Sequence, residues 1–170
     1  YAASCLGRER IFEHFSRTQG LACAIMRLNY AVEMRYGVLA DIGLRVWGGL
    51  PIDLAMGSAN VIWQGDANAQ ALALLEHCES PPNVINVTGP ELVSVRRLAE
   101  TYGQLFGREP VFVGTESDTA LLSNAGKAQR LFGYPRVSVD QLVLWTASWI
   151  EREMPLLNKP THFESRDGAF

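Results

Sequence analysis

The run Leu21-Ala22-Cys23-Ala24-Ile25-Met26 is the longest uninterrupted stretch of apolar residues in the chain. It suits a short strand that is buried on both faces, as in a parallel sheet covered by helices. In residues 1–16, which precede it, Leu6, Phe12 and Phe15 stand among charged residues, and this spacing predicts a helix that ends before Gly20. A helix followed by a buried strand is half of a β-α-β unit, so the run predicts an α/β fold.

Composition places the chain among ordinary globular proteins. Of its 170 residues, 48% are apolar and 19% are charged, which excludes a disordered chain, a collagen-like repeat and a coiled coil. Its 15 basic and 18 acidic residues give a formal charge of −3. The sequence therefore lacks the basic stripe that nucleic-acid and anionic-membrane binding need, and no apolar run approaches the ~20 residues of a membrane span. We expect neither a nucleic-acid nor a membrane partner.

The cysteines and histidines show no pattern of a disulfide framework or a metal site. Cys5, Cys23 and Cys78 are few and scattered, which fits reduced thiols and a cytoplasmic location. The histidines are isolated from one another and from other candidate ligands, so the sequence predicts no metal.

The rest of the chain alternates predicted helices with short predicted strands. Gly48-Gly49 and Gly107 are suited to end helices, while Asp66 and Ser94 are suited to cap them. The predicted helices cover residues 38–47, 66–78, 94–106, 124–132 and 138–151. The predicted strands cover residues 52–56, 59–63, 84–87 and 111–113. Residues 154–170 show no periodicity, and we expect them on the surface or at an interface.

Five short motifs occur in a distinctive order. They are Tyr1 to Cys5 at the head of the first helix, Arg27 to Tyr30 after the apolar run, Val61 to Asn68, Val84 to Gly89 with the helix from Ser94, and Leu122 to Pro135. This order resembles the C-terminal half of the extended short-chain dehydrogenase/reductase family, the NAD-dependent epimerase/dehydratases. In that family a Tyr-x-x-x-Lys helix packs beside the sixth strand of a Rossmann domain, that strand ends in an Arg-x-x-Asn-x-Tyr-like segment, and a small substrate domain follows. The resemblance covers roughly residues 1–150.

The resemblance implies a particular α/β architecture. The last helix and strand of a Rossmann-like doubly wound sheet would be followed by a small α/β substrate-binding domain. Residues 1–30 would be the Rossmann remnant, residues 31–153 the substrate-binding domain, with helix 66–78 returning to the Rossmann side, and residues 154–170 a tail. Because the chain begins at Tyr inside a predicted helix and has no Gly-x-x-Gly-x-x-Gly fingerprint, we expect a fragment of a longer protein.

The resemblance also implies a catalytic role for the head of the first helix. Tyr1 matches the catalytic acid/base, and Cys5 stands where the family has the Lys that favours the phenolate and holds the cofactor ribose. A phenol with its ordinary pKa near ~10 is a poor base unless a cation lies nearby. Either Arg8, on the same helical face and leaning toward the N-terminus, supplies that cation, or the protein has lost or changed the reaction.

Further predicted site residues lie after the apolar run and at the end of the predicted strand 59–63. Arg27, Asn29 and Tyr30 are predicted to lie in the loop beyond the carboxyl end of a strand, where ligands of open α/β sheets bind. The resemblance implies that they bind the cofactor, NAD or NADP, and that Asn29 also contacts substrate. Trp63 and Gln64 are implied to bind substrate, with a core position as the alternative for Trp63.

The implied function is that of an NAD(P)-dependent epimerase, dehydratase or reductase acting on a sugar nucleotide or a related polyhydroxy carbonyl compound. The alternative is a non-catalytic binding or regulatory protein of the same fold, which Cys5 favours. The implied partners are a small-molecule substrate and further copies of the chain in a homo-oligomer. The chain alone is expected to be inactive, because the Gly-rich turn that holds a dinucleotide pyrophosphate is absent from it.

Overall fold

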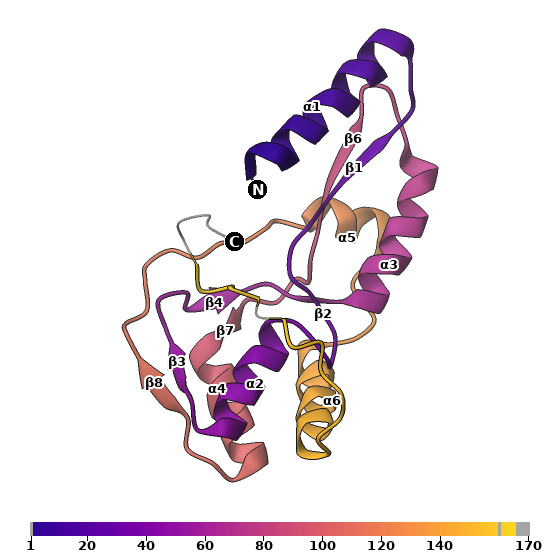
Figure 1. Ribbon diagram of the computed structural model, residues 1–170. Helices are drawn as coiled ribbons and strands as arrows, with labels where there is room; N and C mark the ends of the chain where they lie inside the picture. Colours follow the sequence, from indigo (N-terminus) through magenta and orange to yellow (C-terminus); the bar gives the residue numbers. More distant parts are fainter. Residues whose placement is uncertain (1, 160, 166–170) are drawn as a thin grey trace.

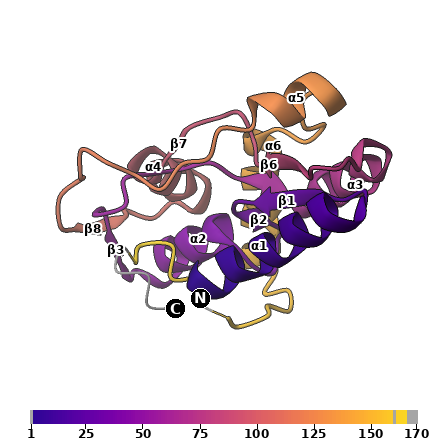
Figure 2. The same ribbon diagram turned by 90° about the horizontal axis from the view of Figure 1, so that it is seen from above.

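The computed structural model describes residues 2–159 and 161–165 (Figure 1). Its upper part is built around two parallel strands, β1 (Ala24–Leu28) and β6 (Asn83–Val87), which are far apart in sequence. Helix α1 (Ala2–Gln19) runs along one side of this pair, and α5 (Gly126–Phe132) lies on the opposite side (Figure 2). Helix α3 (Gln64–Ala73) and the 3-10 turn η1 (Leu74–His77) flank the pair.

The lower part is a bundle of three helices, α2 (Val38–Gly48), α4 (Val95–Phe106) and α6 (Val139–Glu151). Short strands join these helices to each other and to the upper part. They form three pairs: β2 (Ala31–Val32) parallel to β5 (Ile62–Trp63), β3 (Pro51–Asp53) parallel to β8 (Val111–Val113), and β4 (Ser58–Ala59) antiparallel to β7 (Val93–Ser94).

Two clusters of buried side chains hold these parts together. The larger cluster fills the bundle, where Ile42, Tyr102 and Leu142 are at most 1% exposed. The smaller cluster lies between β6 and the helices beside it, and includes Ile85 and Ala128. Burying each large apolar side chain stabilises the fold by roughly 1.5–3 kcal/mol.

Local signals set several helix ends as the sequence predicts. The Ser94 hydroxyl accepts a hydrogen bond from the Arg97 main-chain N–H at 3.3 Å, which caps α4. Gly107 ends the same helix at φ 63°, and Gly49 ends α2 at φ 64°. Both values lie in the left-handed region that glycine adopts without strain. The predicted caps and stops of α2 and α4 are therefore confirmed.

The cap predicted at Asp66 is wrong. Helix α3 begins two residues earlier, at Gln64, and its N-cap residue is Trp63. Asp66 is instead buried, and its carboxylate accepts a hydrogen bond from the Val137 main-chain N–H at 3.0 Å. The hydrogen bond to the distant loop before α6 therefore determines the position of Asp66, and the local preference of Asp for an N-cap does not.

The predicted strands also need correction. The predicted strands 52–56 and 59–63 become three shorter ones, β3, β4 and β5. The strand predicted at 21–26 begins at Ala24 and ends at Leu28, and it is not buried on both faces, since its first three residues are half-buried and its last two exposed, Leu28 by 46%. Among the described residues β1 pairs with β6 alone, so its other edge has no strand partner.

The segment after α6 returns to the bundle. Phe163 is 4% exposed within the larger cluster, and Thr161 donates through its main chain and hydroxyl to the Asp41 carboxylate. Residues 154–170 were predicted on the surface or at an interface, and Phe163 departs from this because its apolar ring lies in the core of the bundle. Within the described part of the chain, no helix has the length and apolar character needed to cross a membrane.

Candidate functional site

The candidate site lies where β1 and β6 end side by side. Leu28 is in register with Val87, and the Asn29 main-chain N–H continues the ladder by donating to the Val87 carbonyl at 3.0 Å. Asn29 and Thr88 are thus the first residues beyond two neighbouring parallel strands. Ligands of open α/β sheets bind at this edge of the sheet.

Two polar side chains at this edge are buried without a partner. Among the described residues, neither the Asn29 amide nitrogen Nδ2 nor the Thr88 hydroxyl Oγ1 has a hydrogen bond, although both atoms are hidden from solvent. Leaving a buried donor unpaired costs about 1–3 kcal/mol, so such groups are uncommon and call for a partner. The sequence prediction included Asn29 and missed Thr88, whose place directly after a predicted strand was the available signal.

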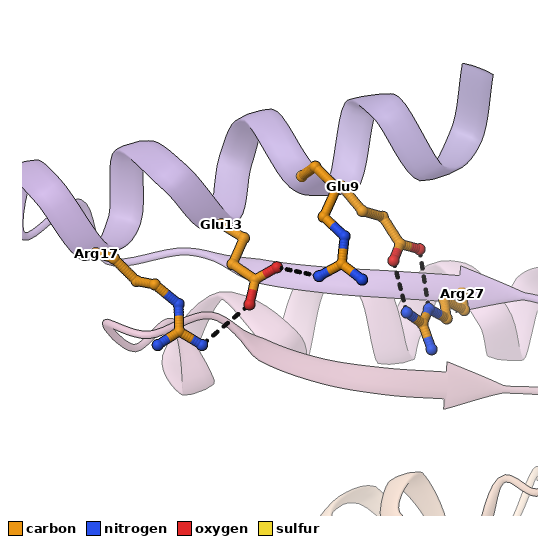
Figure 3. Close-up of polar contacts among 5 residues, drawn as sticks. Glu9, Glu13, Arg17 and Arg27 are labelled. Carbon is orange, nitrogen blue, oxygen red and sulfur yellow. Dashed lines mark hydrogen bonds and ion pairs between the residues drawn. The ribbon is translucent and has the colours of Figure 1, made fainter. Parts of the chain in front are cut away.

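Arg27 is not in the loop where it was predicted, because β1 continues through Leu28. Its guanidinium crosses to α1 and donates from Nε and Nη2 to both carboxylate oxygens of Glu9, at 2.9 and 2.6 Å (Figure 3). This hydrogen bonding lowers the pKa of the Glu9 carboxyl. The same helix carries Glu13 between Arg10 and Arg17, at 2.6 and 3.0 Å. The paired hydrogen bonds between Arg27 and Glu9 therefore connect β1 to α1.

Tyr30 makes the turn from β1 into β2. Its φ of 42° is unusual for a residue other than glycine, and its carbonyl accepts a hydrogen bond from the Ile62 N–H at 3.1 Å. Burial and the nearby charge of Glu164 raise the pKa of the Tyr30 phenol. The Tyr30 hydroxyl is consequently a hydrogen-bond donor at neutral pH.

The catalytic pair implied by the resemblance falls partly outside the described residues, because Tyr1 is not among them. Cys5 is half-buried near the start of α1, and the Arg8 guanidinium donates to its sulfur at 3.7 Å. Arg8 thus leans toward the helix N-terminus, as the sequence predicts, and the position of the family's Lys has a cation beside it.

Trp63 and Gln64 belong to a different surface. The Trp63 ring meets that of Trp145 on α6 edge to face, with centroids 6.0 Å apart, and both rings line a cavity that none of Arg27, Asn29 and Tyr30 lines. Gln64 is the exposed first residue of α3. The structure therefore brings Asn29 to the end of β6, whereas Tyr30 packs against the bundle core and Trp63 lines a separate cavity.

Comparisons with known proteins give a fold but no close relative. A scan against protein-family models finds no match, and a search of the curated proteins finds none. Among solved structures, UDP-glucose 4-epimerase from Thermotoga maritima with UDP-glucose is 20% identical at a TM-score of 0.70, over 87% of this chain and 52% of its own. UDP-glucose 4-epimerase from Thermus thermophilus with NAD is 19% identical at 0.71, over 89% and 53%.

A third match extends the comparison to another reaction. The dTDP-glucose 4,6-dehydratase DesIV from Streptomyces venezuelae, with NAD and TYD bound, is 19% identical at a TM-score of 0.69, over 89% of this chain and 51% of its own. At these identities the likeness shows the fold: an α/β fold with parallel strands that resembles part of epimerase/dehydratase structures. The chain spans about half the length of the structures it matches. The predicted resemblance is thus confirmed for the fold, over about half the length of these structures.

Proposed function

We propose that the chain is the C-terminal, substrate-binding half of an NAD(P)-dependent epimerase, dehydratase or reductase acting on a sugar nucleotide or a related polyhydroxy carbonyl compound. The observation that carries this proposal is the fold shared with two UDP-glucose 4-epimerases and a dTDP-glucose 4,6-dehydratase over about half their length. In this arrangement residues 1–30 complete a Rossmann domain in the cytoplasm together with β6, which pairs with β1, and the bundle of α2, α4 and α6 forms the substrate side.

The unpartnered groups at the strand ends support a substrate rich in oxygen acceptors. The Asn29 amide offers a donor, and the Thr88 hydroxyl offers a donor and an acceptor. Sugar hydroxyls and phosphate oxygens pair with such groups. A ligand that satisfies them recovers the free energy of two buried, unpaired polar atoms, about 1–3 kcal/mol each.

The residues present fit part of a nicotinamide cofactor. Asn29 provides a donor at the strand edge, whereas the Tyr30 side chain packs against the bundle core and two of the donors of Arg27 are engaged by Glu9. The turn that would hold the pyrophosphate is assigned to a part of the protein outside this chain. When bound, the cofactor supplies hydride transfer. In this proposal Tyr1 takes the proton of a substrate hydroxyl or gives its own proton to a substrate carbonyl oxygen, and Arg8 supplies the cation that favours its phenolate.

The second candidate is a non-catalytic protein of the same fold that binds the same class of ligand. Cys5 favours it, since a thiol cannot supply the charge of the Lys that the family places there. The contact between the Arg8 guanidinium and the Cys5 sulfur favours catalysis instead, because it brings a positive charge to this position.

Titration of the whole protein with UDP-glucose and dTDP-glucose tests the proposal. Asn29→Asp, which replaces the unpartnered donor by an acceptor, should weaken binding about tenfold or more. Asn68→Asp on the exposed face of α3 is the matched control and should bind normally. Failure of both sugar nucleotides to bind would refute the proposal. Binding without any change in nicotinamide absorbance would favour the non-catalytic candidate.

We also propose that the protein acts as a homo-oligomer. Leu6, Ile11 and Phe12 are 56%, 58% and 48% exposed on α1, which is more apolar surface than one solvent-facing helix usually presents. Sedimentation velocity of wild type and of Phe12→Glu should show an assembly that the variant disperses. A monomeric wild type at micromolar concentration would refute this assignment.

A further inference from the structure

A cavity on the α6 side of the bundle is separate from the strand-end site. It has a volume of about 380 Å³, within the range of small-molecule sites. Its walls come from β5, α6, the turn after β2 and the segment that follows α6. The residues that define its chemistry are Met34, Trp63, Trp145, Trp149, Arg152 and Met154.

Three indole rings give the cavity its shape. Trp63 and Trp145 meet edge to face at an interplanar angle of 68°. Trp149 donates its Nε1–H to the Pro155 carbonyl at 3.0 Å, which fixes the ring and leaves its apolar surface for the cavity. Trp145 is 38% exposed. Indole faces and edges favour offset or edge-to-face contact with another aromatic ring, and the two thioethers adapt to its outline.

One charge faces this apolar lining. Arg152 is the sole charged residue among those that line the cavity, and Glu151 and Glu153 beside it in sequence are not among them. Within the part of the chain that the structure describes, the Arg152 guanidinium has no ion pair or hydrogen bond, although its main-chain N–H donates to Ser148. A planar guanidinium binds carboxylates through paired hydrogen bonds, so this end of the cavity is complementary to an anion.

We propose that this cavity binds a small aromatic carboxylate. Its ring lies among Trp63, Trp145 and Trp149, and its carboxylate pairs with Arg152. The site is distinct from the substrate edge at Asn29 and Thr88, none of whose residues line it. The proposal does not depend on the proposed function.

The tryptophans make the site measurable. Three of the four tryptophans in the chain line the cavity, so a nitroaromatic probe bound there quenches most of the intrinsic emission. We expect 4-nitrobenzoate to quench saturably with a submillimolar Kd, and calorimetry to give the same Kd. The neutral analogue 4-nitrobenzyl alcohol should bind about tenfold more weakly, because it lacks the charge-assisted pair.

Variants separate the ring contacts from the charge. Arg152→Gln should weaken 4-nitrobenzoate about tenfold and leave 4-nitrobenzyl alcohol unchanged, whereas Trp145→Leu should weaken both. Arg97→Gln and Trp47→Phe, at positions that do not line this cavity, are the matched controls and should bind as wild type does. Circular dichroism melting verifies that each variant is folded.

Three results would overturn the proposal. One is quenching that rises linearly without saturation and without heat. Another is equal affinity for the charged and neutral probes, or no effect of Arg152→Gln. The third is self-association in sedimentation experiments that Trp145→Leu abolishes, which would assign this surface to a second copy of the chain.

Discussion

Replacing Asp66 by alanine tests the role that the structure gives to this residue. Asp66 is 6% exposed, and its carboxylate accepts a hydrogen bond from the Val137 main-chain N–H at 3.0 Å, which ties α3 to the loop before α6. Alanine removes the acceptor and leaves that N–H unpaired near the core. We therefore expect Asp66→Ala to destabilise the fold.

The expected loss distinguishes an anchor from a helix cap. A hydrogen bond to a charged group contributes about 1.5–3 kcal/mol, whereas an N-cap typically contributes ~1 kcal/mol. We expect Asp66→Ala to lower the free energy of unfolding by about 2–3 kcal/mol. For a chain of this size that corresponds to a fall in Tm of roughly 4–12 °C.

Urea unfolding followed by circular dichroism measures this loss, and two further variants sharpen it. Asp66→Asn keeps an acceptor oxygen in place and should cost less than about 1 kcal/mol. Asp66→Ser is a good cap but too short to reach Val137, so it should resemble alanine. Asp140→Ala, in the exposed first turn of α6, is the matched control, with an expected cost below about 1 kcal/mol.

The stability of Asp66→Ser decides whether Asp66 acts as an anchor or as a helix cap. If Asp66→Ser restored wild-type stability, the residue would act as a cap and the contact with Val137 would be dispensable. A loss below about 0.5 kcal/mol in Asp66→Ala would likewise contradict the anchoring role.

Three further predictions concern the two strand ends and α1. A Cβ at Gly89 would lie 2.1 Å from the Val61 carbonyl oxygen, so Gly89→Ala should cost about 2–3 kcal/mol in urea unfolding, and wild-type stability would contradict this close approach. Glu9→Gln should cost less than ~1 kcal/mol at pH 7, because its partner Arg27 is half exposed. Since the pKa of Glu9 is lowered from 4.5, its contribution is present above pH 4.5 and is lost as pH falls through the folded-state value, so wild type and variant should converge in acid; a difference that persists there would contradict the assignment. In the whole protein, Tyr1→Phe should slow the redox half-reaction roughly 10²–10⁴-fold and leave cofactor affinity nearly intact, and unchanged turnover would remove Tyr1 from the mechanism.

The parts of the fold that were predictable depend on neighbours in the sequence. Ser94 and Gly107 act on backbone groups within a few residues, so their pattern was sufficient to place α4. Asp66 was misassigned because its partner, Val137, is remote in the sequence, and no local feature announces the contact. The burial of residues 21–26 was overestimated for a similar reason, since an apolar run indicates a tendency to be covered without specifying what covers it.

The same distinction applies to the candidate site. Asn29 could be predicted, because a polar residue directly after a strand lies at the edge where ligands bind. Arg27 was misplaced because the strand extends further than its apolar part, and its partner Glu9 lies on another element. Thr88 follows a predicted strand in the same way, but only the pairing of β6 with β1 shows that its strand end lies beside that of Asn29.

The parallel pairing of β1 with β6 also affects how fast the chain can fold. Ala24 meets Asn83, so the ladder closes a long loop that contains β2, α2, β3, β4, β5, α3 and η1. Closing such a loop costs chain entropy before any strand contact compensates for it. Packing α2 on α4 and α6 closes loops that are as long or longer, so neither the ladder nor the bundle forms from contacts between sequence neighbours. Folding of this chain is therefore expected to be slow for its size, and the effect of substitutions in β1 on the folding rate measures how far the ladder has formed in the transition state.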